Sequence, residues 1–256
     1  MHDCNDPDLV PRWFPIARSE EVEKRHVFHA KLLGEELAVW RDDEGRINAW
    51  ENRCAHRGVR LTIGDNLGAE LRCRYHGWRY LSGTGQCSVI PAHPGQTPSP
   101  AIRAKAYRCA ERYNFVWVSL GSEGEIPEIA TLAGDAPLTL RSIFVEAAAP
   151  VVGAALAGIA GATIRDPFTI ETGDTIVTLL QPVSQGRCII HAALTPAPSG
   201  DARLPVLRQH NERLSALRDA IERAGTGRLF DASTATTVDL YRRQVADTRL
   251  AYCVAS

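Results

Sequence analysis

Two short segments constrain this chain more than any other part of it: Cys54-Ala55-His56-Arg57-Gly58 and Cys73-Arg74-Tyr75-His76-Gly77. They form the pattern Cys-x-His, sixteen intervening residues, and then Cys-x-x-His. Two thiolates and two imidazoles can converge on one site only if the two loops lie side by side. We therefore expect a fold that brings these loops together around a metal centre.

The order of the four side chains distinguishes between two kinds of centre. Zinc is the simplest candidate for two Cys and two His, but one Cys and one His in each loop is not the usual zinc-finger order. A [2Fe–2S] cluster that holds one iron on two Cys and the other on two His needs one ligand for each iron from each loop. The pattern favours this cluster on Cys54, His56, Cys73 and His76, with a reduction potential between about −150 and +300 mV.

At this point the chain resembles a known family, the Rieske non-haem iron oxygenases. The resemblance covers nearly all of the first half and is carried by Trp13–Ala17, Arg41-Asp42, Arg53–Gly58, Cys73–Tyr80, Ile90–Ala92 and Val116–Val118. It implies that Cys54 and Cys73 hold one iron, while His56 and His76 hold the outer, solvent-facing iron. Rieske proteins of respiratory complexes fit less well, because their loops carry an extra Cys pair that is absent here. Small Rieske ferredoxins end near Gly121.

Charge and cysteine content limit the setting in which such a chain works. Lys+Arg 29 against Asp+Glu 30 gives a net charge of −1, so a nucleic-acid partner is not expected. The 7 cysteines are an odd number, and the polar, acidic start at Met1–Asp6 lacks signal-peptide character. We therefore expect a cytoplasmic protein. The uncharged segment Ala147–Ile164 is rich in Ala and Gly, and we expect a packed helix there rather than a membrane span.

The composition changes along the chain, which predicts an α+β protein in two parts. Residues 1–122 are expected to form an all-β Rieske domain, with strands at 38–41, 47–50 and 113–120. The polar linker Gly121–Pro127 marks the boundary. Residues 123–256 are expected to form a truncated α+β domain of the helix-grip-like oxygenase type, with these elements: strands over 168–171, 175–180 and 188–194, and helices over 204–221 and 239–252.

The second part lacks the expected ligands of a mononuclear iron. The resemblance implies two His and one carboxylate on this iron, in a pattern close to Asp-x-x-His-x-x-x-x-His. Laid over Val145–Gly158, those positions fall on Pro150, Gly153 and Gly158, and there is no His between His93 and His191. Arg203 stands about where the carboxylate is expected. We interpret His191 as a core residue of a strand and His210 as lying on a solvated helix face. The mononuclear iron is therefore predicted to be absent.

These features predict a Rieske subunit that passes electrons from a reductase or ferredoxin to the mononuclear iron of a partner oxygenase subunit. The resemblance implies trimer-based hetero-oligomers, with His76 as the exit ligand. No G-x-G-x-x-G or P-loop pattern occurs, so the electron donor is a separate protein. Two alternatives stay open. One is a complete, divergent mono- or dioxygenase or demethylase that uses His191 and His210. The other is a structural or regulatory subunit. We leave open whether the chain is itself an enzyme, and we predict no substrate.

Overall fold

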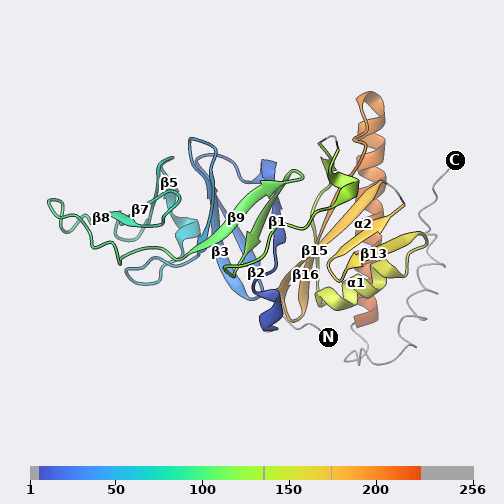
Figure 1. Ribbon diagram of the computed structural model, residues 1–256, viewed down its shortest axis with the longest axis horizontal. Coiled ribbons are helices and arrows are strands. Elements are labelled where there is room, and N and C mark those ends of the chain that lie inside the picture. The colour runs from blue at the N-terminus through green and yellow to red at the C-terminus, as the bar shows by residue number, and fades with distance from the viewer. Residues whose placement is uncertain (1–5, 135, 174, 226–256) are drawn as a thin grey trace. The chain divides into compact units, whose positions relative to one another are not determined.

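The computed structural model describes residues 6–134, 136–173 and 175–225. It divides into two compact units, one over Val10–Ile126 and one formed by the described residues from Pro127 onward together with residues 6–9 (Figure 1). The helix predicted over 239–252 lies outside the described residues. Each unit is described below by itself.

The first unit is built of antiparallel strands, as the sequence predicts. Six strands form one sheet in the order β1-β10-β9-β4-β3-β2, and four short strands form a second sheet in the order β5-β6-β7-β8. Their bounds are β1 Phe14–Arg18, β2 Val27–Leu32, β3 Glu35–Arg41, β4 Ile47–Glu51, β5 Asp65–Asn66, β6 Glu70–Arg72, β7 Arg79–Leu81, β8 Cys87–Val89, β9 Ala106–Arg112 and β10 Phe115–Ser119. Single 3₁₀ turns lie at Ser19–Glu21 and Leu61–Ile63.

Turn residues set where the strands of this unit begin and end. Gly45, with φ of +92°, lies in the predicted hairpin between β3 and β4. Tyr113 and Asn114 have φ of +57° and +60°, so they make the turn between β9 and β10, and the strand predicted over 113–120 begins only at Phe115. All five residues of β10 are buried rather than alternately exposed, so both faces of this strand are covered.

The two loops that carry the Cys/His pattern leave different sheets. The first follows β4 of the large sheet, and the second follows β6 of the small sheet. Beneath them lies one apolar cluster that includes Trp50, Leu61 and Leu71, with the Trp50 and Tyr80 rings meeting edge to face at 6.4 Å. Burial of large apolar side chains is the main force that stabilises a fold. The core therefore joins the two sheets directly below the two loops.

The second unit is an antiparallel sheet with two helices. Its strand order is β11-β16-β15-β14-β13, and β12 also pairs with β16. The bounds are β11 Leu138–Thr139, β12 Ile143–Val145, β13 Ala162–Asp166, β14 Thr169–Thr172, β15 Ile176–Ser184, β16 Arg187–Leu194, α1 Ala149–Ala157 and α2 Arg203–Gly225, with 3₁₀ turns at Pro7–Leu9, Ala130–Leu132 and Gly200–Ala202. The α+β prediction is confirmed.

The uncharged segment of the second unit does not form one continuous helix. α1 ends at Ala157, and Gly161 with φ of +77° turns the chain into β13. Within the described residues, no helix is both long and apolar enough to cross a membrane. The expectation of a packed helix therefore holds over nine residues, and the rest of the segment is turn and strand.

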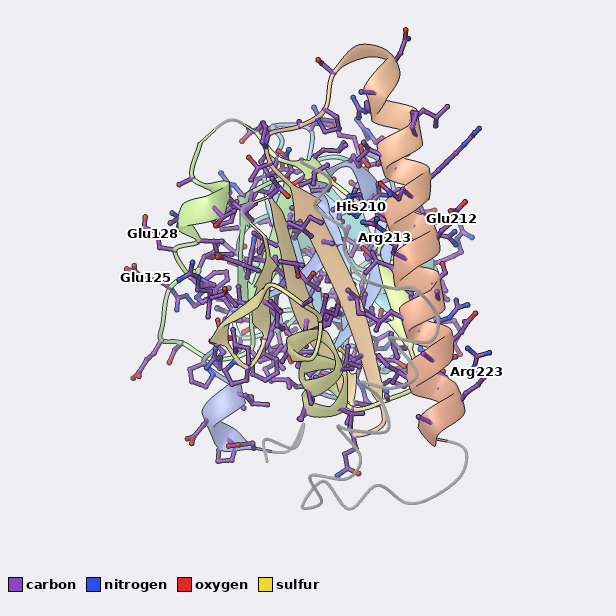
Figure 2. The ribbon with its side chains drawn as sticks, turned by 90° about the vertical axis from the view of Figure 1, so that its right-hand side faces the viewer. Glu125, Glu128, His210, Glu212, Arg213 and Arg223 are labelled. Carbon is purple, nitrogen blue, oxygen red and sulfur yellow. The ribbon has the colours of Figure 1, made fainter. Side chains whose placement is uncertain are left out.

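One side-chain interpretation for this unit is wrong. His210 is 6% exposed and lies on the face of α2 that also buries Leu214, Leu217 and Ile221. Figure 2 shows His210 on the sheet-facing side of α2 and Glu212 on the outer side. Residues four apart lie on one helix face, so His210 follows Leu214 into the core despite its charged sequence neighbours.

Candidate metal centre

The two ligand loops have the same backbone frame. In the first loop the Cys54 N–H donates to the carbonyl of Val59 at 2.8 Å, and the Gly58 N–H donates to the carbonyl of Cys54 at 2.8 Å. The second loop repeats both bonds at the same spacing: Cys73 N–H to Trp78 at 2.8 Å, and Gly77 N–H to Cys73 at 3.0 Å. The pattern Cys-x-x-x-Gly common to both loops therefore has a structural cause.

Glycine is required at the fifth position of each frame. Gly58 and Gly77 have φ of +68° and +71°, in the left-handed region that residues with a Cβ rarely adopt. A Cβ added at Gly77 would also lie 3.1 Å from Cγ of Pro91, a residue of the segment between β8 and β9. The two tight turns hold the intervening side chains in fixed directions.

The His residues occupy different places in these equal frames. His56 is two residues after Cys54, whereas His76 is three residues after Cys73. Their Nδ1 atoms approach to 3.1 Å, with ring centroids 4.8 Å apart and planes 60° apart. Both residues are exposed. Although the Cys–His spacing differs by one residue between the two loops, the two imidazoles face each other at the surface.

The two thiols form the buried counterpart of the imidazole pair. Cys54 is 4% exposed and Cys73 is 2% exposed, and both are free thiols. Burial raises the pKa of the Cys73 thiol, and its contact with Cys54 raises this pKa further. A bound metal compensates for this effect, because coordination removes the thiol proton.

A tyrosine hydroxyl completes the buried side. The Tyr80 hydroxyl lies 3.0 Å from Sγ of Cys54 and accepts a hydrogen bond from the Ala55 N–H at 3.1 Å. Burial first, and then the contact with Cys54, raise the pKa of Tyr80, so its proton is retained. Since its oxygen already accepts from Ala55, the hydroxyl proton can be donated to a Cys54 thiolate.

Each imidazole also has an aromatic neighbour. Trp78 stacks on His56 with ring centroids 4.5 Å apart and planes 4° apart, and Tyr75 lies against His76 at 3.7 Å and 33°. The pKa of His56 is lowered by desolvation, by His76 and by the nearby Arg57 guanidinium. The lowered pKa favours the neutral form of the His56 imidazole, which is the form that binds metal.

The donors present fit a two-metal centre better than a single ion. Among residues 6–134, 136–173 and 175–225, no three Cys, His, Asp or Glu side chains converge as one metal ion would require. A [2Fe–2S] cluster places only two protein ligands on each iron. A buried thiol pair and an exposed imidazole pair match that division. The assignment of Cys54, His56, Cys73 and His76 as ligands stays a prediction.

The second unit does not offer His191 as a free ligand. Its Nδ1 lies 2.8 Å from Oγ of Ser142, its Nε2 lies 2.8 Å from Oε1 of Gln181, and it is 1% exposed. The interpretation of His191 as a core residue is correct. The positions aligned with missing iron ligands, Pro150 and Gly153, lie within α1, and Gly158 caps its C-terminal end.

Sequence reasoning assigned no role to two residues of the site, Tyr80 and Trp78. Both stand in the segment Cys73–Tyr80 that carries the resemblance, so the signal was present. What the segment did not show is that the Tyr80 hydroxyl reaches Cys54 of the other loop.

Comparison with known proteins agrees with this geometry. Residues 12–107 match the family model described as the Rieske [2Fe-2S] domain. The chain is 38% identical over 242 residues to Oxidoreductase NdmD of Pseudomonas putida, and this alignment covers 85% of this chain and 41% of that protein. It is 32% identical over 139 residues to Methylxanthine N1-demethylase NdmA of the same organism, covering 52% of this chain and 39% of that protein. The chain thus spans about two fifths of the length of these relatives.

Solved structures show the same fold. A structure of NdmA from Pseudomonas putida CBB5 superposes with a TM-score of 0.69 at 22% identity, covering 93% of this chain and 89% of that chain. Apo dicamba monooxygenase superposes with a TM-score of 0.68 at 16% identity, covering 94% and 99%. These likenesses extend across both units of the chain. Whether the second domain is shortened stays a prediction.

Proposed function

Because residues 12–107 belong to the Rieske [2Fe–2S] domain family, we propose that the chain passes electrons within an oxygenase system. The chain is a homologue of Rieske non-haem iron oxygenase components, which supports this setting. The observation that carries the proposal is the division of the candidate ligands. Cys54 and Cys73 are buried, whereas His56 and His76 face each other at the surface.

The bound cluster would supply reversible one-electron transfer at a potential set by its ligands and their hydrogen bonds. The residues of this chain support that role in distinct ways. Tyr80 can donate a hydrogen bond to Sγ of Cys54. The apolar core below the loops excludes water from the thiol side. The exposed imidazoles of His56 and His76 give a short route to a partner that approaches these loops.

We further propose that the electrons come from a reductase or ferredoxin and go to the mononuclear iron of a partner oxygenase subunit, in a trimer-based hetero-oligomer. His76 is the proposed exit ligand. The demethylase and monooxygenase names among the relatives support an oxygenase setting. The free thiols of the five described cysteines support the reducing cytoplasm as the location.

We propose that the chain does not itself hold the mononuclear iron. Both ring nitrogens of His191 already have partners, which counts against the alternative of a divergent oxygenase that uses His191 and His210. The burial of His210 within the face of α2 that contacts the sheet also counts against it.

A second candidate function is the Rieske-bearing part of an oxidoreductase that donates electrons to an oxygenase. One observation favours it: the match to NdmD, an oxidoreductase, extends over 85% of this chain, whereas the match to the demethylase NdmA extends over 52%. Under either candidate the chain carries electrons and does not activate dioxygen.

The test is a metal and spectroscopic analysis of the anaerobically purified chain. We expect two irons and two sulfides per chain, a Rieske-type electron paramagnetic resonance signal after reduction, and no oxygen consumption with a reductase and candidate substrates. A His76→Ala variant should lose the signal, whereas a His93→Ala variant, changed at an exposed His between β8 and β9, should keep it. Three irons per chain, or substrate-dependent oxygen consumption, would contradict the iron-free proposal, and zinc in place of iron would contradict the cluster.

A further inference from the structure

The two ligand loops carry an unusual excess of positive charge. Segments 53–60 and 73–78 contain four arginines, which are Arg53, Arg57, Arg60 and Arg74, and no acidic residue, in a chain whose net charge is −1. The two loops therefore have a local excess of positive charge beside the exposed imidazoles, although the chain as a whole is close to neutral.

Ion pairs neutralise only part of this charge. Arg53 lies 3.9 Å from Glu51, and Arg60 forms a two-bond pair with Glu36, at 2.7 and 2.8 Å. Arg74 and Arg72 share one carboxylate, that of Asp65, so this group keeps one positive charge. Arg57 is exposed, and no ion pair of Arg57 is found within the described part of the chain. Unpaired surface charges act at a distance and steer the approach of charged partners.

An exposed aromatic side chain lies among these arginines. Tyr75 is 56% exposed, although its ring lies against His76 with centroids 3.7 Å apart. Tyr and Arg, together with Trp, are enriched among the residues that contribute most to binding at protein–protein interfaces. Trp78, the ring that stacks on His56, is half-buried. The Tyr75 side of the imidazole pair is therefore the more exposed of the two sides.

We propose that Arg57, Arg74 and Tyr75, together with the imidazole edges of His56 and His76, form a docking face for the acidic surface of a redox partner protein. The proposal rests on the function proposed above and adds the chemistry of the partner. Complementary charge around an exposed redox centre speeds encounter and selects the partner without requiring a large or tight interface. The overall charge of −1 supports a local acidic patch, rather than a long polyanion such as nucleic acid, as the occupant.

The first experiment measures affinity without turnover. An acidic plant-type ferredoxin, labelled with a fluorescent dye, serves as the protein probe, and its anisotropy is followed while the oxidised, cluster-loaded chain is added. We expect Kd to rise about 10-fold between 20 and 200 mM salt. Arg57→Glu should weaken binding about 10-fold at low salt, and Tyr75→Ala should weaken it while leaving the salt dependence unchanged.

The matched control is Arg141→Glu, which makes the same charge change at an exposed arginine of the second unit for which no ion pair is found among the described residues. It should bind the ferredoxin like the unchanged chain. Iron content and the resonance spectrum of every variant verify that the cluster is present. A chain without a cluster would refute the proposed function, whereas a loaded chain whose Kd ignores Arg57→Glu would refute the docking face alone.

The second experiment uses inorganic oxidants of opposite charge. One electron leaves the dithionite-reduced chain and converts ferricyanide to ferrocyanide, or hexaammineruthenium(III) to the ruthenium(II) ion. At low salt, Arg57→Glu should lower the rate of electron transfer to the anionic ferricyanide and raise the rate to the cationic ruthenium complex, each about 3-fold to 10-fold. Salt at 0.5 M should remove both effects. Equal rates in the variant and the unchanged chain would overturn the proposal. So would tighter binding of the face to a 12-base-pair DNA duplex than to the ferredoxin.

Discussion

The indole of Trp78 lies parallel to the imidazole of His56, with ring centroids 4.5 Å apart and planes 4° apart. Trp78 is also the residue whose carbonyl accepts the Cys73 N–H. One residue therefore closes the frame of the second loop and, through its side chain, orients the His of the first loop. The stack links the two loops without any bond between their backbones.

Loss of this stack should loosen His56. An aromatic pair contributes about 0.5–1.5 kcal/mol beyond its buried area. This is enough to change the population of the stacked orientation of His56 by a factor of about two to ten. We expect Trp78→Leu to broaden the resonance signal of the reduced chain and lower its iron content, and Trp78→Phe to preserve most of both. The backbone bond to Cys73 is available in either variant. Identical spectra for Leu and Phe would mean that the stack does not position His56.

The hydroxyl of Tyr80 should raise the reduction potential. A hydrogen bond to a sulfur ligand stabilises the more negative, reduced state. Taking this difference as about 1 kcal/mol for one electron, Tyr80→Phe should lower the midpoint potential by about 40 mV. Potentiometric titration followed by circular dichroism in the visible range measures it. Tyr113→Phe, in the turn between β9 and β10, is the control and should leave the potential unchanged. An unchanged potential in Tyr80→Phe would show that the hydroxyl does not donate to Cys54.

How far the site could be predicted depends on the range of each interaction. The Cys/His spacing and the glycine at the fifth position act within one loop, so a short segment contains them. The contact between Tyr80 and Cys54 depends on strand pairing, because Tyr80 in β7 lies opposite Leu71 in β6. Such a pairing is set by tertiary structure, and no local pattern predicted that the hydroxyl would reach the first loop.

The same reason explains the error at His210. Its immediate neighbours, Arg208, Gln209, Asn211 and Glu212, suggested a solvated face. The burial of a helical residue is set by residues three and four positions away, and here Leu214 and Leu217 are buried. The apolar residues recur along α2 with helical spacing, so the helix was predicted. The position of His210, four residues before Leu214, places it on the same face, and this was not taken into account.

The ion pair of Arg41 and Glu111 should stabilise the first unit. The guanidinium forms two bonds of 2.7 Å to the carboxylate and donates further bonds to the carbonyls of Val22, Gly45 and Ser19. The hydrogen bond from Arg41 holds the pKa of Glu111 below its usual value, and burial opposes this less strongly. Since the Glu111 side chain is 34% exposed, we expect Glu111→Gln to cost only about 1 kcal/mol of unfolding free energy at pH 7.

The sign of its pH dependence follows from the lowered pKa. The stabilisation by Glu111 is complete above the carboxyl pKa of the unfolded chain and is lost as the pH falls through the lower pKa of the folded state. All 5 tryptophans lie in the first unit, so urea unfolding followed by tryptophan fluorescence reports on this unit. The difference between Glu111→Gln and the unchanged chain should shrink as the solution becomes acidic. A Glu44→Gln control, at an 83% exposed side chain, should show no difference at any pH.

His210 should make the second unit sensitive to acid. Desolvation, and secondly the Arg213 charge, lower the pKa of His210, so the folded unit holds this imidazole neutral. Above about pH 6.5, the ordinary value for His, the folded and unfolded states are both neutral and the group adds no pH dependence. Below it the unfolded chain binds a proton that the folded unit binds only at lower pH, so stability falls as the pH falls.

A His210→Gln variant separates this effect from general acid unfolding. Glutamine has no charge at any of these pH values, so the stability of the variant should fall less between pH 7 and 5 than that of the unchanged chain. Circular dichroism at 222 nm follows α1 and α2, both in the second unit, while tryptophan fluorescence follows the first unit of the same sample. The variant should alter the acid response of the dichroism signal and leave that of fluorescence unchanged. His29→Gln, at an exposed strand position of the first unit, should alter neither. If the stability of His210→Gln and of the unchanged chain fell in parallel with pH, His210 would be protonated equally in the folded and unfolded states. The burial of its ring on α2 would then not control its charge.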